Sequence, residues 1–501
     1  MKLPCARRCL RGAAAALALA LAGCSVGPDY KKPEMADLPT DWHWRKADPR
    51  DDAPKGDWWK IFHAPRLDEL ESRALAGNTD LQQAVSRVDN ARAQARLQGA
   101  AFFPSLNLDP SYTRQQQPAD LPQYSKVPIP GIQQRFEPYN SFSVPLDLSY
   151  EVDLWGRVRR GFEAARAQAQ ASLADYENVR LTLTGDVAID YFTLREYDEE
   201  IRILTIASDT REKAVEINRT RVRAGRATEI DVAQAQTDYT NALADLASVQ
   251  RSRAETEDAL AVLCGTMPGT LPQPEDPLGT EAPAVPVGLP AGVLERRPDI
   301  AEAERQMAAA NAQIGVAYAA FFPTVTLTGQ GGYLSARATD LFTWQNSVWS
   351  IGPSIQLPIF LGGRNEAQLK AARADYQGQV AHYRGTVLGA VRDVEDSLAD
   401  LRFIRRQRDA LDLSVASSRL ATDLARRRFL VGQSNYTDVI VAEETQLTAE
   451  RAQSQSRGQI LYATVRLIKA MGGGWDASML TAEQPGPGFF DANTVKLPEK
   501  P

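Results

Sequence analysis

The sequence predicts a mixed α and β membrane protein built from two copies of one unit. Three observations in the 501-residue chain lead to this fold class. Two very long stretches lack proline, two short segments alternate strictly between apolar and polar residues with a weaker partner for each, and a set of landmarks recurs in the same order in both halves. Each copy is therefore expected to combine long helices with a pair of strands.

The N-terminus has the charged-then-apolar pattern of a secretion signal. Its apolar run over 13–22 is too short for a spanning helix, which needs about 20 residues. The following Leu21-Ala22-Gly23-Cys24 resembles a bacterial lipobox, so residues 1–23 are predicted to be a signal peptide and Cys24 to carry lipid. Ser25 beside the lipidated cysteine favours sorting to the outer membrane. The alternative is an ordinary signal peptide that ends near a cysteine.

Cysteine content and charge exclude two classes of protein. Signal cleavage would remove Cys5 and Cys9, which leaves Cys264 without a partner once Cys24 is lipidated. No disulfide framework is therefore expected. The formal charge of −6 becomes more negative after cleavage, because the signal peptide is basic. A chain this acidic is a poor candidate for binding nucleic acid.

The proline-free stretches predict long helices. No proline lies between Arg157 and Met267 or between Ile359 and Gln484, and apolar residues recur there at helical spacing. Helices are predicted at about 66–101, 157–222 and 228–265 in the first copy, and at about 299–321, 364–430 and 436–471 in the second. A helix of about 65 residues, at 1.5 Å per residue, is on the order of 100 Å long. Such helices exceed any globular core and must pack on one another as in coiled coils.

Four segments have the period of strands, at about 105–113, 141–150, 324–334 and 348–358. The second places five apolar residues on one face, namely Phe142, Val144, Leu146, Leu148 and Tyr150. One apolar and one small polar face over roughly ten residues is what a membrane-spanning strand requires. Half-buried hairpins on a soluble domain are the alternative.

The number of strands predicts self-association, provided that the strands cross a membrane. An open sheet edge has no hydrogen-bond partners in lipid, and known barrels begin at about eight strands. One chain with four strands cannot close a barrel. Two copies would give eight strands and three would give twelve.

The landmarks of this chain resemble the TolC-like outer membrane factors, in the lipoprotein (NodT-type) branch that serves resistance-nodulation-division efflux pumps. The resemblance runs from Cys24 to about Trp475. It rests on several motifs in order: Cys24-Ser25-Val26-Gly27-Pro28-Asp29-Tyr30, Trp58-Trp59-Lys60-Ile61-Phe62, Tyr150-Glu151-Val152-Asp153-Leu154-Trp155-Gly156-Arg157, Arg296-Arg297-Pro298-Asp299-Ile300 and Ala470-Met471-Gly472-Gly473-Gly474-Trp475.

The resemblance implies a homotrimer in which each chain gives four strands to a 12-stranded β-barrel. A long periplasmic α-helical barrel with an equatorial belt continues it. The implied organisation is a lipid-anchored N-terminal segment and belt at 24–64, a first repeat at 65–270, a connection at 271–297, a second repeat at 298–474 and a C-terminal tail at 475–501.

The implied function is the outer-membrane channel of a tripartite efflux pump in a Gram-negative bacterium. It would conduct drugs or other small toxic compounds passively from the periplasm to the exterior. The implied partners are outer-membrane lipid, a periplasmic adaptor protein and an inner-membrane resistance-nodulation-division transporter. A duct for protein secretion and a pore-less, lipid-anchored coiled-coil scaffold are the alternatives.

Site residues follow from the same resemblance. The helix turns for adaptor contact are Gly225-Arg226 and Gly432-Gln433. Carboxylates beyond these turns are expected to form the periplasmic gate, and the residue before each matches a position that narrows the aperture sterically. The four gate residues are Ile230, Asp231, Thr437 and Asp438. An acidic residue here also complements a helix dipole, which is the structural alternative for both aspartates.

Nothing in the sequence indicates an enzyme. The three histidines, His43, His63 and His382, have no metal-ligand spacing. Neither a phosphate-binding glycine loop nor a nucleophile elbow occurs, so no cofactor, metal or catalytic residue is expected.

Overall fold

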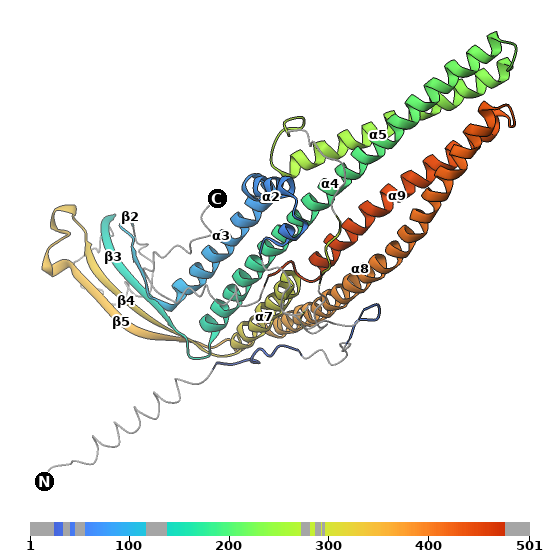
Figure 1. The fold of residues 1–501 in the computed structure, drawn as a ribbon. Coiled ribbons are helices and arrows are strands. Elements are labelled where there is room, and N and C mark those ends of the chain that lie inside the picture. The colour runs from blue at the N-terminus through green and yellow to red at the C-terminus, as the bar shows by residue number, and fades with distance from the viewer. Residues whose placement is uncertain are drawn as a thin grey trace, which may run out of the picture.

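The structure is a computed structural model that describes residues 25–33, 41–45, 56–116, 138–271, 281–285, 292 and 296–475. The predicted signal peptide, Cys24 and the predicted tail beyond Trp475 lie outside these residues. Figure 1 shows a small sheet at one end, from which two long helical hairpins extend in one direction.

The helices repeat in length as well as in order. Helix α4 (Arg157–Arg223) and helix α8 (Arg364–Leu430) have 67 residues each. Helix α5 (Glu229–Leu263) and helix α9 (Tyr436–Ala470) have 35 each. α4 packs against α5 and α9, and α9 packs against α8. The helical layer therefore runs α5, α4, α9, α8, with a first-repeat helix at one edge and a second-repeat helix at the other.

The segment predicted as one helix over 66–101 contains two. Helix α2 (Pro65–Gly77) ends before Asn78, and helix α3 (Thr79–Gly99) begins after it. The Asn78 side chain accepts a hydrogen bond from the backbone N of Leu81 at 2.9 Å, so it caps a new helix. A short 3₁₀ turn, η2 (Ala100–Phe102), follows α3. The second repeat has one helix in the corresponding place, α7 (Pro298–Ala319).

All strands that the structure describes belong to one antiparallel sheet. They are β1 (Ser105–Leu108), β2 (Ser111–Gln115), β3 (Tyr139–Val152), β4 (Thr324–Ser335) and β5 (Ser347–Gln356). Their order is β1-β3-β4-β5, and β2 also pairs with β3. Two 3₁₀ turns, η3 (Ala338–Asp340) and η4 (Trp344–Asn346), lie between β4 and β5.

β1 and β2 are one strand with an interruption. Ser105 pairs with Ser149 and Ser111 with Ser143, so both segments keep the same register against β3. The gap falls at Asp109 and Pro110. Asp109 N donates to Pro145 O at 3.3 Å. Pro145 has no N–H to return, which breaks the ladder at this point. The predicted segment 105–113 thus forms one strand in two parts, β1 and β2.

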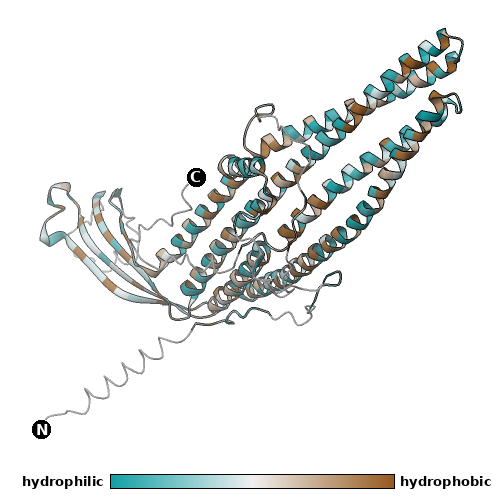
Figure 2. Cartoon of the chain, viewed as in Figure 1, coloured by the Kyte–Doolittle hydropathy of each residue, from teal (hydrophilic) through white to brown (hydrophobic). Residues whose placement is uncertain are grey.

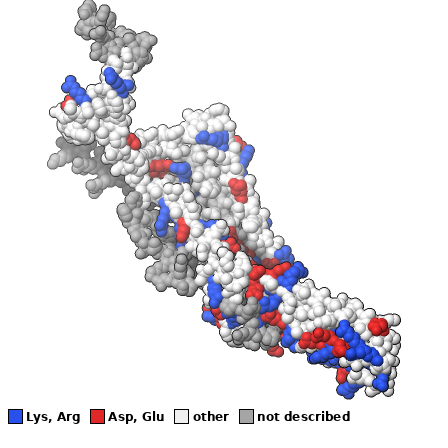
Figure 3. Space-filling model, turned by 90° about the horizontal axis from the view of Figure 1, so that it is seen from above, with Lys and Arg blue, Asp and Glu red and all other residues white. Residues whose placement is uncertain are grey.

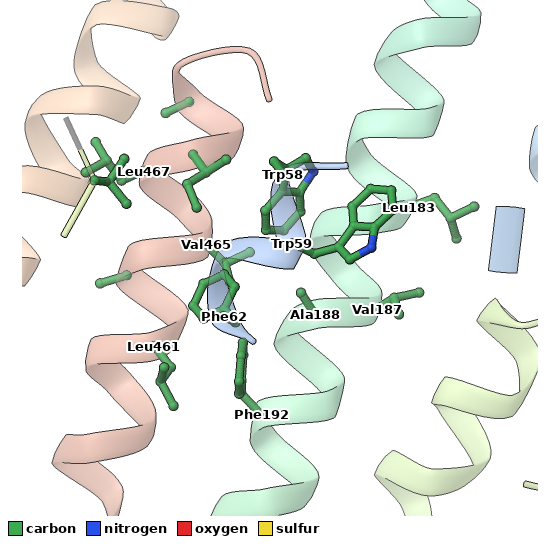
Figure 4. Close-up of a cluster of buried hydrophobic side chains, with 14 of the residues drawn as sticks. Trp58, Trp59, Phe62, Leu183, Val187, Ala188, Phe192, Leu461, Val465 and Leu467 are labelled. Atoms are coloured by element: carbon green, nitrogen blue, oxygen red, sulfur yellow. The ribbon is translucent and has the colours of Figure 1, made fainter. Parts of the chain in front are cut away.

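The main apolar core lies where the N-terminal part of the chain crosses the two repeats. Figure 4 shows Trp58, Trp59 and Phe62 of the 3₁₀ helix η1 (Trp58–Phe62) between α4 and α9. Trp58 is 1% exposed, and its Nε1 donates to Thr184 Oγ1 at 3.2 Å. These aromatic side chains join the first repeat to the second. Across the described ranges, no helix is long and apolar enough to cross a bilayer.

Candidate channel wall and helical tips

One face of the sheet is apolar and is not covered by other residues that the structure describes. Trp349, Ile351 and Ile355 are 78%, 82% and 69% exposed. Cross-strand pairing places Leu106 opposite Leu148, and Leu108 opposite Leu146, on this same face. Figure 2 shows the alternation along the strands as interleaved brown and teal bands. A contiguous apolar face of this kind is exceptional in water and suits contact with lipid.

The opposite face carries small polar and amide side chains. Asp147 lies opposite Asn107 on one side and Gln330 on the other. Gln330 Nε2 donates to Asp147 Oδ1 at 2.7 Å. Figure 3 shows that charged residues crowd the helical end, whereas the sheet end in this view is largely uncharged inside its outer rim. The sheet thus has one apolar and one polar face, as a segment of a membrane β-barrel does.

Among the residues that the structure describes, the sheet has two edges without a further paired strand. The first repeat supplies one edge, β1 with β2, and the second repeat supplies the other, β5. The helical layer has the same arrangement, with α5 and α8 at its edges. Sheet and helices thus present a first-repeat edge on one side and a second-repeat edge on the other.

The predicted tip residues lie at the turns of the helical hairpins, at the end remote from the sheet (Figure 1). Gly225 has φ 68° and Gly432 has φ 77°. Gly225 N donates to Val222 O and Arg226 N to Arg221 O, at 2.9 and 2.8 Å. Gly432 and Gln433 repeat this bonding with Phe429 and Arg428. Both turns are Schellman motifs, in which glycine supplies the left-handed backbone that ends a helix.

The four predicted gate residues all lie in the first turn after these loops. Ile230 is 67% exposed. Asp231 Oδ2 accepts from the backbone N of Thr228 at 2.7 Å and from its hydroxyl at 2.8 Å, so Asp231 belongs to a capping box. Thr437 and Asp438 are exposed. Asp438 forms no such capping box with Asn435, the cap of α9. The two aspartates therefore have different local roles despite their matched positions.

An apolar cluster holds the two hairpins together near their tips. It consists of Val215, Ala235, Phe429, Tyr436 and Val439. The Arg221 guanidinium lies over the Phe429 ring, 4.1 Å from its centroid. The tips of the two repeats are therefore in contact within one chain.

A buried arginine adds an ionic link between the hairpins, on the side of this cluster that is away from the tips. Arg211 is 3% exposed. Its Nε lies 3.2 Å from Asp238 Oδ2, and its guanidinium donates to Glu444 Oε2 at 2.7 Å. Asp238 is on α5 and Glu444 on α9, so Arg211 joins three helices. Burial raises the pKa of the Asp238 carboxyl, which the Arg211 charge opposes.

Sequence reasoning missed this arginine. Its equivalent in the second repeat is Ser418, so the repeat pattern does not mark it. The available signal was a charged residue within an otherwise repeated helix, but the helix that faces it depends on tertiary packing.

The predicted lipidation residue, Cys24, lies outside the described residues, but the residues after it are placed. Val26 N donates to Trp155 O at 3.0 Å. A Cβ on Gly156 would lie 2.9 Å from Ser25 Cβ. Residues 155 and 156 join β3 to α4, so Ser25 and Val26 lie at the junction of the sheet and the helices.

Comparison with known proteins decides the family. The model of the outer membrane efflux protein family matches residues 70–266 and 289–473. This chain belongs to the outer membrane efflux protein family.

Individual relatives agree with this assignment. The chain is 33% identical over 470 residues to the toluene efflux pump outer membrane protein TtgC of Pseudomonas putida, covering 92% of this chain and 95% of TtgC. The antibiotic efflux pump outer membrane protein ArpC of the same species gives the same identity and coverage. The structure is similar to the outer-membrane channel OprN, with a TM-score of 0.82 and 29% identity over 90% of this chain and 100% of that one.

Membership confirms the family resemblance and the predicted function class. The chain is the outer-membrane channel component of an efflux pump of Gram-negative bacteria, and it is a conduit, not an enzyme.

Proposed function

We propose that three copies of this chain close into one duct that conducts drugs or other small toxic compounds passively to the exterior. The exposed apolar face of an open sheet supports this proposal most strongly, because such a face is stable in lipid only if both sheet edges are paired. A first-repeat edge and a second-repeat edge form a head-to-tail contact, which generates a closed ring when the rotation permits. Three chains would bring twelve strands to that ring.

The duct would span the outer membrane and extend into the periplasm through its helices. Cys24 would anchor the mature chain by lipid at the periplasmic rim of the barrel, since Ser25 and Val26 lie at the junction of sheet and helices. A periplasmic adaptor would contact the turns at Gly225 and Gly432, and an inner-membrane transporter of the resistance-nodulation-division class would load the substrate. Relatives named for toluene and antibiotic efflux support small organic substrates.

We place the periplasmic gate at the start of α5 and α9. Three copies of Asp231 and Asp438 would bring like charges together around one axis, with Ile230 and Thr437 beside them. Such rings favour cations and respond to salt and protonation.

Single-channel recording in planar bilayers tests the duct and its gate together. The Asp231→Ala/Asp438→Ala double variant is expected to raise conductance several-fold, because shorter side chains widen the constriction. A matched Asp231→Asn/Asp438→Asn variant keeps side-chain size, and the new amide oxygen at position 231 can still accept the bond from Thr228 N. It is expected to lower cation selectivity with a much smaller gain in conductance.

The two readouts separate the possible failures. If neither double variant changes conductance or selectivity, these residues do not line the constriction. If the unaltered protein forms no channels, the duct itself is refuted.

A further inference from the structure

We infer that β5 of one copy, together with the residues that follow it as far as Ile359, pairs antiparallel with β1 and β2 of the next copy in a single register that places Leu357 opposite Leu108 and Gln356 opposite Asp109. This inference rests on the proposed trimer and adds the residues that seal it. It follows from the internal duplication.

Pairing within each repeat shows which residues are equivalent. In the first repeat Ser105 pairs with Ser149, and in the second Thr324 pairs with Gln356. The landmarks Phe102 and Phe321 make Ser105 equivalent to Thr324, and Gly156 and Gly363 make Ser149 equivalent to Gln356. The two strand pairs, β1 with β3 and β4 with β5, therefore have identical registers, although the loops within them differ in length.

The contact between the repeats is a template for the contact between copies. β3 of the first repeat pairs with β4 of the second, with Tyr150 opposite Leu327 and Val152 opposite Val325. The equivalent of β3 is β5, and the equivalent of β4 is β1 with β2. Replacing each residue by its equivalent puts Leu357 opposite Leu108, and Ile359 opposite Leu106, of the next copy.

Exposure at these positions agrees with a missing neighbour. Leu357 and Ile359 are 54% and 92% exposed, and Leu106 and Leu108 are 60% and 58% exposed. Tyr150 and Val152, the equivalents of the first two, are partly buried beside β4. The inferred register brings the four exposed side chains together on the lipid face.

The ladder pattern also turns the backbone N of two prolines, Pro110 and Pro353, toward this seam, whereas that of Pro358 turns toward β4. Asp109 N donates toward β3. In an antiparallel ladder the backbone N and O atoms of successive residues point to alternate sides of the strand, so those of residue 110 point toward the open edge. The same alternation, followed through β3 and β4, shows that the backbone N and O atoms of residue 353 in β5 point away from β4, toward the other open edge. Pro110 and Pro353 thus lack donors only on the sides that face other chains, where proline is tolerated in a strand. The complete ladder bonds of the seam would lie nearer the helices, at Leu357 and Ile359.

Disulfide trapping tests the register. Gln356→Cys combined with Asp109→Cys joins a pair that faces the lumen and makes no ladder bond, where side chains are closest. Oxidation of the full-length protein in membranes is expected to convert monomers to covalent dimers and trimers on denaturing gels, reversibly with reductant. Leu357→Cys with Leu108→Cys is a second pair on the lipid face. Cys264 is 2% exposed and stays out of reach.

A shifted pair, Gln356→Cys with Asn107→Cys, is the matched control. Its residues would be diagonal, with Cα atoms about 7–8 Å apart, too far for a disulfide. The single variants should stay monomeric on the gel.

Native mass spectrometry of the unoxidised variants separates this inference from the proposed function. Cross-linking of the shifted pair, or a trimeric mass with neither predicted pair cross-linked, would refute the register and leave the trimer intact. A monomeric mass for the unaltered protein would refute both.

Discussion

At the scale of single residues, buried acids shape the contact between α4 and α9. Glu196 is 8% exposed, and its Oε2 accepts a hydrogen bond from Tyr462 Oη at 2.5 Å. A Cβ on Gly458 would lie 2.5 Å from the same oxygen, so glycine permits the close approach of the helices. Burial raises the pKa of Glu196 to about 7, against the lowering effect of the Tyr462 hydrogen bond.

This pKa predicts that mild acid stabilises the α4 and α9 contact. A raised folded-state pKa means that folded Glu196 holds a proton at pH values where the unfolded chain has released it. Its contribution to stability therefore increases as pH falls from 8 through about 7 toward the unfolded value of 4.5. The thermal midpoint should rise between pH 8 and pH 6.

A Glu196→Gln variant is the control, because it keeps an acceptor for Tyr462 and cannot titrate. Burial raises the pKa of Asp190 to about 6 and of Glu302 to about 7, so the variant should flatten the pH dependence only in part. An equal rise in midpoint for both proteins would show that Glu196 is not the group responsible.

Gate residues show what a sequence can and cannot reveal at this scale. The turns at Gly225 and Gly432 were predictable, because a helix that ends in a left-handed residue requires glycine. The capping bond of Asp231 follows from its place three residues after Thr228. The partners of Arg211 were not predictable, because they come from α5 and α9 and depend on how the hairpins pack.

At the scale of elements, Arg211 is a buried ionic link between the hairpins. An Arg211→Ala variant leaves Asp238 buried without its cation, which is expected to cost about 3 kcal/mol. The loss should appear as a lower opening free energy in hydrogen exchange of α5 and α9 amides near Asp238 and Glu444.

An exposed ion pair on the same helix is the comparison. Arg219 is 54% exposed in its side chain and pairs with Glu216 at 3.8 Å. An Arg219→Ala variant should change the opening free energy by about 0–1 kcal/mol. Equal effects of the two variants would remove the special role of Arg211.

Element boundaries followed the sequence where local chemistry sets them. The predicted helix 364–430 coincides with α8, since glycines flank it and no proline interrupts it. The break at Asn78 escaped the periodic pattern, because the apolar spacing continues on both sides of the cap. The interruption at Asp109 escaped it because the strand opposite, with Pro145, belongs to a distant segment.

At the scale of the whole molecule, duplication makes one chain a fraction of a ring. Each chain has a first-repeat edge and a second-repeat edge in both its sheet and its helical layer. Exposed leucines lie along the α8 edge, where Leu413 and Leu420 are 72% and 60% exposed. The same contact that joins the repeats within a chain can therefore join neighbouring chains.

The most direct test removes the lipid anchor and measures the mass of the protein that stays in the membrane. A Cys24→Ala variant with a signal peptide that is still cleaved would be extracted from outer membranes with detergent and measured by native mass spectrometry. We predict that it remains an integral membrane protein with the mass of three chains, because the apolar faces of its sheets stay in lipid. A freely soluble single chain would contradict this account.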